Sequence, residues 1–399
     1  SIKIYVYQDH SNVIFMDTLV LKGKEENIMR KKKSVLSRLS AIIIAAGMIL
    51  TACGTTQGES DSGNGEGSNS SSSGEVIRVA TMPNHIGLPI QYAVEQGYYE
   101  DAGLNIEMIL FSTGSPINEA LSAEQVDLAG SGMASVFALA AGDCYWLGDM
   151  VETVDGLGVY VRPDSPVLDH KGEVEGYPDV YGSAETIKGM TILGSLGTSD
   201  QFEAVSWAQV FGLTGNDFQM LNMDRGPAVQ AFKTGEGDAI ACGGPPYNYE
   251  LEAAGYIEVA DITDVSGISV SDGLIGRKAF VDEREDDVKK FIEVTYKAID
   301  EFYSNDDIVL EEGMKFYNDN GKDYSEEMME GEIKDKDYIG KETMSDPEYR
   351  FGSTMVGMGK FYVTDGKIEP ELEENIYTSM YPNFLAEIYG IDIQVFENK

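Results

Sequence analysis

The sequence predicts an α/β protein of two similar lobes, each a parallel-rich sheet flanked by helices, joined by two crossings of the chain. Two observations carry this prediction. Three strand-turn-helix units follow one another between residues 76 and 142, and three more with similar turn chemistry run from 190 to 254. Repeated strand-helix units are typical of a parallel sheet. Between the two sets, a stretch rich in Gly, Pro and Tyr interrupts the pattern.

The first set opens with alternating β-branched residues at 76–81, and Pro89 follows in the first turn of a helix. After the second strand, Ser115 and Pro116 suit the start of another helix. The third unit is a strand, a Gly-Ser-Gly turn at 130–132 and a helix. These three units are predicted to form the sheet and helices of the first lobe.

The second set restarts at Met190, and the chain is expected to cross between the lobes near 156–166 and 263–275, which would form the hinge. After the second crossing, apolar residues keep helical spacing over 285–303, and the remaining acidic segments show no new strand-helix rhythm. We therefore predict lobe 1 at 76–160 and 266–399, and lobe 2 at 161–265.

An apolar run of about a dozen residues ends at Cys53, after a basic stretch that begins at Met29. The run is shorter than the roughly 20 residues that a membrane-spanning helix needs. Together these features resemble a bacterial lipoprotein signal over residues 29–52. The resemblance implies cleavage before Cys53, a lipid on that cysteine, and anchoring to the outer face of the bacterial cell membrane.

Residues 1–28 stand before this signal without an initiating Met at position 1, and we interpret them as upstream DNA read into the sequence. Gly, Ser and acidic residues dominate 53–75, which cannot bury a core and is expected to be a flexible tether. The folded part is thus predicted to begin near Val76, outside the cytoplasm.

The composition excludes several kinds of partner. The formal net charge is -39, and residues 53–399 hold 21 Lys and Arg against 64 Asp and Glu. Such a surface repels phosphate backbones, so nucleic acid and anionic lipid surfaces are not expected partners. Three dispersed cysteines are too few for a disulfide framework or a zinc cluster. Cys144 and Cys242 fall in different lobes, where we expect two buried free thiols.

Six turns at the ends of the predicted strands are candidate ligand contacts, three in each lobe. Ligands of open α/β sheets lie beyond the carboxyl ends of the strands, where helix N-termini offer unpaired N–H groups to anions and polar groups. Ordinary helix capping explains each turn taken alone. For example, Thr198 and Gln201 fit a capping box. The duplication of the turns across two lobes is what indicates one shared cleft.

Several segments in this order resemble the periplasmic-binding-protein type II family, namely "QYAVEQGYYEDAGLNIE", "FSTGSPINEALSAEQVDLAGSGMASVFALAAG" and "AVQAFKTGEGDAIACGGPPYNYELEAAG". The resemblance spans roughly residues 76 to 385. It points to the branch that binds nitrate, taurine, alkanesulfonates or thiamine pyrimidine precursors for ABC importers. It implies two lobes that close on a small molecule, and a monomer that delivers it to a membrane permease driven by a separate ATPase.

The resemblance implies ligand contacts from all six turns. Arg225 is the only basic residue in them and suits a bidentate bond to a sulfonate or carboxylate, with a salt bridge to a surface acid as the alternative. Carried over by position, the predicted contacts are Asn84, His85, Thr113, Ser115, Ser131 and Met133 in lobe 1, and Gly197, Thr198, Ser199, Asp224, Arg225 and Tyr247 in lobe 2.

Some features keep two interpretations. Tyr145 and Trp146 suit core packing, or else an aromatic wall for a ring-shaped ligand. Residues 167–187 suit a surface loop, or else a lid. Where relatives often carry a Trp or an acid, Gly243 and Gly244 leave space for a bulkier ligand. The ligand is expected to be a small organic anion or a heterocycle.

The sequence leaves two other classes of function as alternatives. Beyond residue 52 only two histidines occur, with none of the H-E-x-x-H, G-x-S-x-G or G-x-x-x-x-G-K-[ST] motifs, so no catalytic residue, metal or cofactor is expected. An enzyme resembling the pyrimidine synthases that share the expected fold is a distant alternative. A structural or adhesive surface lipoprotein, which needs no paired lobes, is the nearer one.

Overall fold

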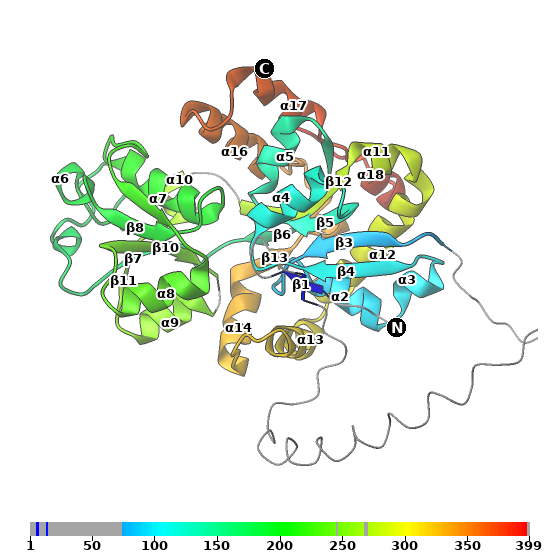
Figure 1. Ribbon diagram of the computed structural model, residues 1–399, viewed down its shortest axis with the longest axis horizontal. Helices are drawn as coiled ribbons and strands as arrows, with labels where there is room; N and C mark the ends of the chain where they lie inside the picture. Colours follow the sequence, from blue (N-terminus) through cyan, green and yellow to red (C-terminus); the bar gives the residue numbers. More distant parts are fainter. Residues whose placement is uncertain (1–4, 8–12, 15–73, 245, 267–269, 397–399) are drawn as a thin grey trace, which may run out of the picture. The chain divides into compact units, whose positions relative to one another are not determined.

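The computed structural model describes residues 5–7, 13–14, 74–244, 246–266 and 270–396. The chain forms two mixed sheets with helices on their faces (Figure 1). Within the described ranges, no helix combines the length and the apolar character that crossing a membrane requires. The predicted signal peptide and Cys53 lie outside the described residues.

The first sheet has the strand order β13-β6-β12-β5-β3-β4-β1-β2. Strand β3 pairs in parallel with β4 and β5, whereas β12 runs antiparallel to both β5 and β6. Its strands are β1 (Tyr5–Tyr7), β2 (Val13–Ile14), β3 (Ile77–Thr81), β4 (Ile106–Leu110), β5 (Leu128–Ser131), β6 (Cys144–Thr153), β12 (Val270–Arg277) and β13 (Lys336–Tyr338). We call this sheet and the helices packed on it lobe 1.

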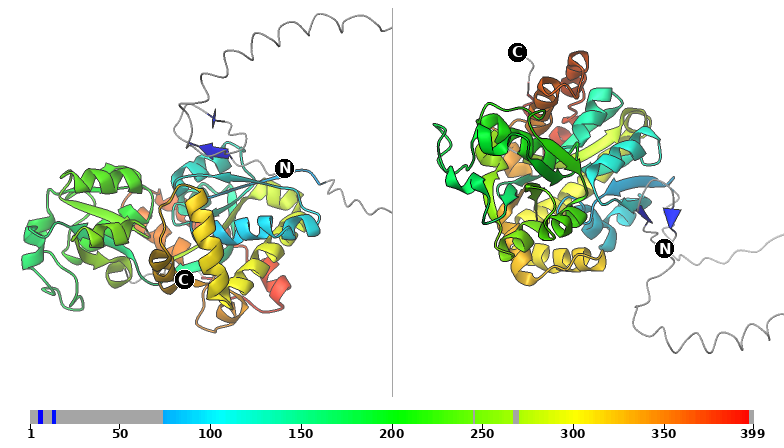
Figure 2. Two further views of the ribbon diagram at one scale, coloured as in Figure 1. Left: turned by 90° about the horizontal axis from the view of Figure 1, so that it is seen from below. Right: turned by 60° about the vertical axis from the view of Figure 1, so that its left-hand side comes forward.

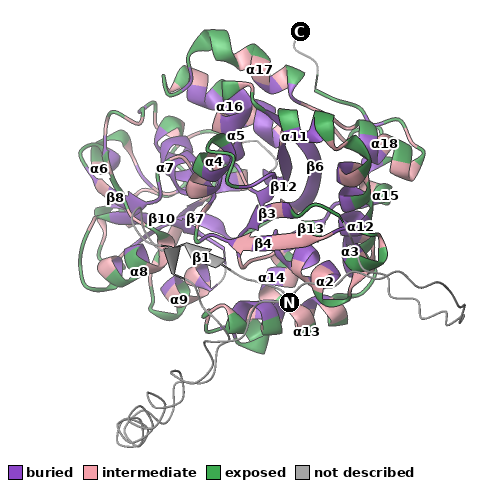
Figure 3. Ribbon diagram, turned by 45° about the vertical axis from the view of Figure 1, so that its right-hand side comes forward, coloured by how far each residue is buried: buried purple, intermediate pink, exposed green. Residues whose placement is uncertain are grey.

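The helices of lobe 1 come from both ends of the described chain. Helix α12 packs on α2, and α16 and α17 pack on α5, so the C-terminal helices cover the first sheet's own helices. Figure 3 shows buried residues at the centre and exposed ones on the outer helices. The helices are α2 (Leu88–Glu95), α3 (Tyr98–Asp101), α4 (Gly114–Ser122), α5 (Ser135–Ala141), α11 (Lys278–Glu283), α12 (Glu285–Tyr303), α13 (Asp306–Asp319), α14 (Glu326–Asp335), α15 (Lys341–Met344), α16 (Ser353–Thr364), α17 (Glu373–Thr378) and α18 (Asn383–Tyr389).

The second sheet has the order β11-β7-β10-β8-β9, and we call it with its helices lobe 2. Helices α7 and α10 lie on one face, and α8 and α9 on the other (Figure 1). Its elements are β7 (Leu157–Val161), α6 (Ala184–Ile187), β8 (Thr191–Gly194), α7 (Ser199–Val210), β9 (Gln219–Asn222), α8 (Arg225–Lys233), β10 (Ala239–Gly243), α9 (Tyr247–Ala253), β11 (Ile257–Asp261) and α10 (Ile262–Ser266).

Both lobes share one strand order. In each, three parallel strands stand in the order second, first, third, and an antiparallel strand that follows a crossing comes next, either β12 or β7. The sheets are therefore mixed, because the strand that enters after a crossing runs the opposite way. Strand β7 already pairs in the second sheet, although the predicted boundary put most of it in lobe 1.

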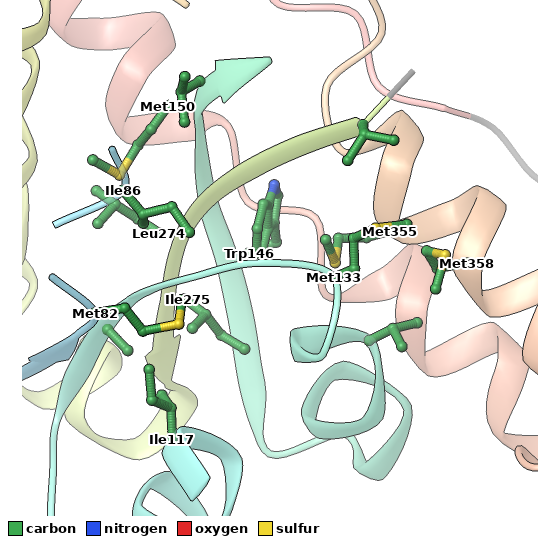
Figure 4. Packing of buried hydrophobic residues seen from close by; sticks show 14 of the residues in the cluster. Met82, Ile86, Ile117, Met133, Trp146, Met150, Leu274, Ile275, Met355 and Met358 are labelled. Carbon is green, nitrogen blue, oxygen red and sulfur yellow. The ribbon is translucent and has the colours of Figure 1, made fainter. Parts of the chain in front are cut away.

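Trp146 is fully buried in the core of lobe 1 and donates a hydrogen bond from Nε1 to Asp149 Oδ1 at 2.7 Å. Figure 4 shows it with Met133, Leu274 and Met355 nearby. Core packing, not an aromatic ligand wall, is therefore its role. Cys144 in β6 and Cys242 in β10 are free and buried, as the sequence predicts.

Candidate functional site

A cleft of about 980 Å³ is lined by residues from both lobes. In lobe 1 its wall includes the turns that follow β3, β4 and β5, and in lobe 2 it includes the turns that follow β8, β9 and β10. These are the six turns that the sequence singled out. The carboxyl ends of two parallel strand sets therefore face one shared space.

Ten of the twelve predicted site residues line the cleft: Asn84, His85, Thr113, Ser115, Met133, Thr198, Ser199, Asp224, Arg225 and Tyr247. Ser131 does not, because it is fully buried at the end of β5, beneath the turn at Gly114. Gly197 does not either. It has φ +71°, and a Cβ there would lie 3.6 Å from Ser115 Oγ, so Gly197 faces lobe 1 directly instead of the open cleft.

The turns of lobe 1 are shaped by short-range bonds. Asn84 Oδ1 accepts a hydrogen bond from the Ile86 backbone N–H at 3.1 Å, which fixes the entry into α2. Thr113 is the N-cap of α4 but makes no side-chain capping bond. The first N–H groups of α4 are therefore not capped by that hydroxyl and remain suited to a polar or anionic guest.

Helix α7 begins differently from the predicted capping box. Thr198 Oγ1 accepts from the Asp200 N–H at 3.3 Å and donates to the Ser195 carbonyl at 2.8 Å. Gln201 Oε1 accepts from the Gly197 N–H at 2.9 Å, one residue before the position that a capping box requires. Side chains at the start of the helix thus hold the turn together with Asn222 of β9, whose Oδ1 accepts from the Leu196 N–H at 2.9 Å.

Arg225 is held in a salt bridge, and its partner is a buried acid rather than a surface one. Its Nε and Nη2 lie 2.9 and 2.6 Å from Asp200 Oδ1, and Nη2 also donates to Ser199 Oγ at 2.7 Å. Burial alone would lower the pKa of Arg225, but the Asp200 charge outweighs burial and raises it. One edge of the guanidinium is therefore occupied, and its Nη1 points toward Gly244 at the cleft wall.

His85 bridges two carboxylates that the sequence analysis missed. Its Nε2 lies 2.9 Å from Asp272 Oδ2 in β12, and its Nδ1 lies 3.2 Å from Glu332 Oε1 in α14. Glu332 also accepts hydrogen bonds from Tyr317, at 3.0 Å, and from Tyr324. Burial raises the pKa of Glu332, but His85 and the other donors outweigh burial and hold it below the usual range.

Two lysines of the C-terminal segment also line the cleft, and the sequence analysis missed both. Lys336 in β13 is buried and donates to the Asp155 carbonyl at 3.4 Å, at the first crossing. Lys322 lies between α13 and α14. Both lysines belong to a segment without the strand-turn-helix pattern, so nothing in the neighbouring sequence marks them as cleft residues.

The fold and the cleft together define a two-lobed periplasmic-binding-protein architecture, and solved structures with low sequence identity share it. An alkanesulfonate-binding protein of Xanthomonas axonopodis pv. citri bound to MOPS aligns with a TM-score of 0.59 at 15% identity, over 77% of this chain and 98% of that one. A nitrate-binding protein of Synechocystis PCC 6803 aligns with a TM-score of 0.61 at 14% identity, over 79% and 88%. The predicted fold class is confirmed.

Sequence comparisons agree. The family model described as NMT1/THI5 like matches residues 82–143. A Brachyspira hyodysenteriae protein with the provisional name ABC transporter periplasmic binding protein is 26% identical over 354 residues, which is 86% of this chain and 98% of the relative. A Bacillus subtilis protein provisionally named aliphatic sulfonates-binding protein is 25% identical over 219 residues, 53% of this chain and 61% of the relative. The predicted resemblance is confirmed.

Proposed function

We propose that this chain is the solute-binding protein of an ABC importer, which captures a small organic anion or heterocycle in the cleft and delivers it to a membrane permease driven by a separate ATPase. The observation that carries the proposal is the cleft itself, where the turns of two equally ordered sheets face each other. The similarity to an ABC transporter periplasmic binding protein along nearly its whole length supports the transport role. The protein accordingly works outside the cytoplasm.

Capture is proposed to occur by lobe closure, with the hinge where the chain leaves lobe 1 after Thr153 and where it re-enters lobe 1 at Val270. Few polar contacts in the cleft join the facing turns: Ser112 Oγ donates to Asp224 Oδ2 and Ser115 Oγ to the Leu196 carbonyl, both at 3.4 Å. Bonds this long and exposed contribute little. A ligand that touches both walls would therefore decide the balance between open and closed states.

The cleft wall carries both signs of charge, which suits a ligand held by several polar groups. Its basic side chains include Arg225, Lys322 and Lys336. Its acidic side chains include Asp224, Asp272 and Glu332. Residues 167–187 contribute no lining residue to it, which supports a surface loop and not a lid. Lipid attachment at Cys53, a monomeric state and the absence of catalysis complete the proposal.

Thermal unfolding of the purified protein against a panel of ligands tests this function. The panel holds taurine, alkanesulfonates, nitrate, thiamine pyrimidine precursors and aromatic acids, and the protein is first stripped of bound ligand. A true ligand at a hundredfold excess over its Kd adds about 2.7 kcal/mol of stability, a shift of several degrees. Small-angle scattering should then show a smaller radius of gyration.

The competing functions predict other results. A structural or adhesive lipoprotein would show no shift with any compound and no ligand-induced closure. An enzyme would consume a compound that shifts the melting temperature, which chromatography of the incubated mixture would detect.

A further inference from the structure

Lys322 differs from the other cationic side chains of the cleft. Its side chain is half-buried and lines the cleft, yet among the described residues no group forms a salt bridge or a side-chain hydrogen bond with its ammonium. Arg225 is engaged by Asp200, and Lys336 donates to a backbone carbonyl. Lys322 Nζ lies over the rings of Tyr317 and Tyr324, whose centroids are 5.0 and 6.0 Å away.

The turn that carries Lys322 is firmly held. Gly321 has φ +82°, which allows the chain to reverse at the end of α13, and the Lys322 N–H donates to the Tyr317 carbonyl at 3.0 Å. Asn318 closes the turn on both sides, because its Oδ1 accepts from the Tyr324 N–H at 2.8 Å and its Nδ2 donates to the Tyr324 carbonyl at 3.2 Å. The ammonium is therefore presented by an ordered turn.

The electrostatic surroundings leave this ammonium incompletely compensated. Burial lowers the pKa of Lys322 to about 8, and the positive charge of Arg225 acts in the same direction. The negative charge of Glu332 opposes both effects, but this carboxylate is already bonded to His85 and two tyrosines. A partly desolvated cation close to a second cation creates a positive electrostatic potential, and this potential favours the binding of an anion.

We propose that Lys322 is a specificity-determining residue of the cleft, which binds an anionic group of the ligand from the lobe 1 side, opposite Arg225 and the start of α8. The inference rests on the proposed function and narrows its ligand to compounds that carry at least one negative charge. The rings of Tyr317 and Tyr324 lie beside the lysine, and the charge of Glu332 favours its ammonium form. The anionic group of the ligand pairs with the Lys322 ammonium from the side of the cleft.

Proton linkage gives this role a signature that a structural lysine lacks. A sulfonate stays charged throughout the range from pH 6.5 to 9.5, so any change in its affinity comes from the protein. It binds the ammonium form of Lys322, which is fully populated well below pH 8 and is lost as the pH rises through about 8. The affinity is therefore constant at low pH and falls up to about tenfold per unit above pH 8.

The experiment is calorimetric titration of the purified full-length protein with ethanesulfonate, nitrate and the neutral ethyl methyl sulfone, from pH 6.5 to 9.5. Three variants accompany it: Lys322→Met, Lys322→Arg and the control Lys315→Met. Lys315 lies in α13, is paired with Glu95 and does not line the cleft, so its variant makes the same change in net charge. Melting temperatures show that each variant is folded.

We expect Lys322→Met to weaken binding of the anion about 10- to 100-fold at pH 7 and to remove the pH dependence. Lys322→Arg should keep the affinity and also lose the fall above pH 8, because a guanidinium does not titrate there. Lys315→Met should match the parent protein, and the sulfone should bind weakly to all of them.

Limited acetylation of the parent protein gives a second measurement that needs no variant. Mass spectrometry of the peptide that contains Lys322 should show a labelling rate that rises around pH 8 and falls when ethanesulfonate is present. Equal labelling with and without the sulfonate, under conditions where it binds, would overturn the inference.

The two proposals fail differently. If the protein binds sulfonate or nitrate and Lys322→Met binds it equally well, the lysine has no such role and the solute-binding function stands. If the parent protein binds only neutral heterocycles, the inference is likewise overturned while the function survives. If no compound binds at all, both fall.

Discussion

At the residue scale, two basic side chains that line the cleft are paired with buried carboxylates. Asp200 is fully buried below Arg225, and Glu332 is buried below His85. Asp200 lies behind the guanidinium that reaches the cleft, whereas Glu332 lines the cleft together with His85. Such pairs orient the basic group but make the acid dependent on it, because an unpaired buried charge is costly.

Replacing Arg225 by Met should therefore reduce the free energy of unfolding by about 3–5 kcal/mol, because it leaves the Asp200 carboxylate buried without its partner. Urea denaturation at pH 7 measures the loss. Replacing Asp200 by Asn in the same molecule should recover most of the stability. A loss below about 1 kcal/mol would show that Arg225 does not neutralise Asp200.

Glu203 in α7 should make the stability of the protein fall as the pH rises. The residue is 1% exposed, both carboxyl oxygens lack a hydrogen-bond partner among the described residues, and burial raises its pKa well above the usual value, with Asp200 adding to the shift. A carboxyl whose pKa is raised by folding is protonated in the native state, so its contribution is complete below the unfolded pKa and is lost above it.

Glu203→Gln removes this dependence. Relative to the parent protein, the variant should gain about 1.4 kcal/mol per pH unit above roughly pH 4.5, until the native pKa is reached. Chemical denaturation between pH 4 and 8 measures the difference. Glu236→Gln, at an exposed turn of the same lobe, is the control and should show no such trend. A constant difference across the range would refute the assignment.

At the element scale, the sequence predicted the two sets of strand-turn-helix units but not the helices that brace them. Alternating strands, Pro89 in the first turn of α2 and the turn residues after each strand are local signals, and they identified ten cleft residues. Lys322 and Glu332 reach the cleft only because α13 and α14 fold back onto lobe 1. That placement depends on packing over long sequence separations, which no local pattern encodes.

Helix α14 also contacts lobe 2, where it lies beside α9 (Figures 1 and 2). Tyr249 of α9 donates a hydrogen bond to Asp335 at 3.1 Å, and its hydroxyl lies so close to Gly331 that a Cβ there would collide with it. A glycine in mid-helix is usually unfavourable, and here it allows the close approach. The α9–α14 contact is thus a fixed point between the lobes.

Gly331→Leu should push α9 away from α14 and favour a more open arrangement. Small-angle scattering without ligand should show a larger radius of gyration, and affinity for a ligand that needs closure should fall about 3- to 10-fold. Lys334→Leu, an exposed position of the same helix, serves as the control. An unchanged scattering curve for Gly331→Leu would mean that the contact does not govern opening.

At the scale of the whole molecule, the duplicated sequence pattern corresponds to a duplicated topology. The three parallel strands of each lobe could be predicted because each is followed by its own helix. The antiparallel pairing of β7 and β12 could not be predicted, since each pairs with strands far away in the sequence. The predicted parallel-rich sheets are therefore mixed, and the first passage between the lobes comes earlier than expected.

The two thiols give a test of the folded molecule as a whole. Burial raises the pKa of Cys144 to about 12 and that of Cys242 well above its usual value. A thiol reagent at pH 8 should label neither Cys144 nor Cys242 in the native protein and both after unfolding without reductant, as mass spectrometry of their peptides would show. Rapid labelling of either residue in the native protein, or failure to label either one after unfolding, would contradict the buried free state.

The pairing of β6 with β12 has a consequence for the history and engineering of the chain. Thr153 and Val270 are direct partners in the ladder, so the chain leaves lobe 1 and returns to it at adjacent points. The chain between these two residues is topologically an insertion at the tip of a β-hairpin. A turn of a few residues would connect β6 directly to β12. One lobe could thus have been acquired, and could be exchanged, without rethreading the other.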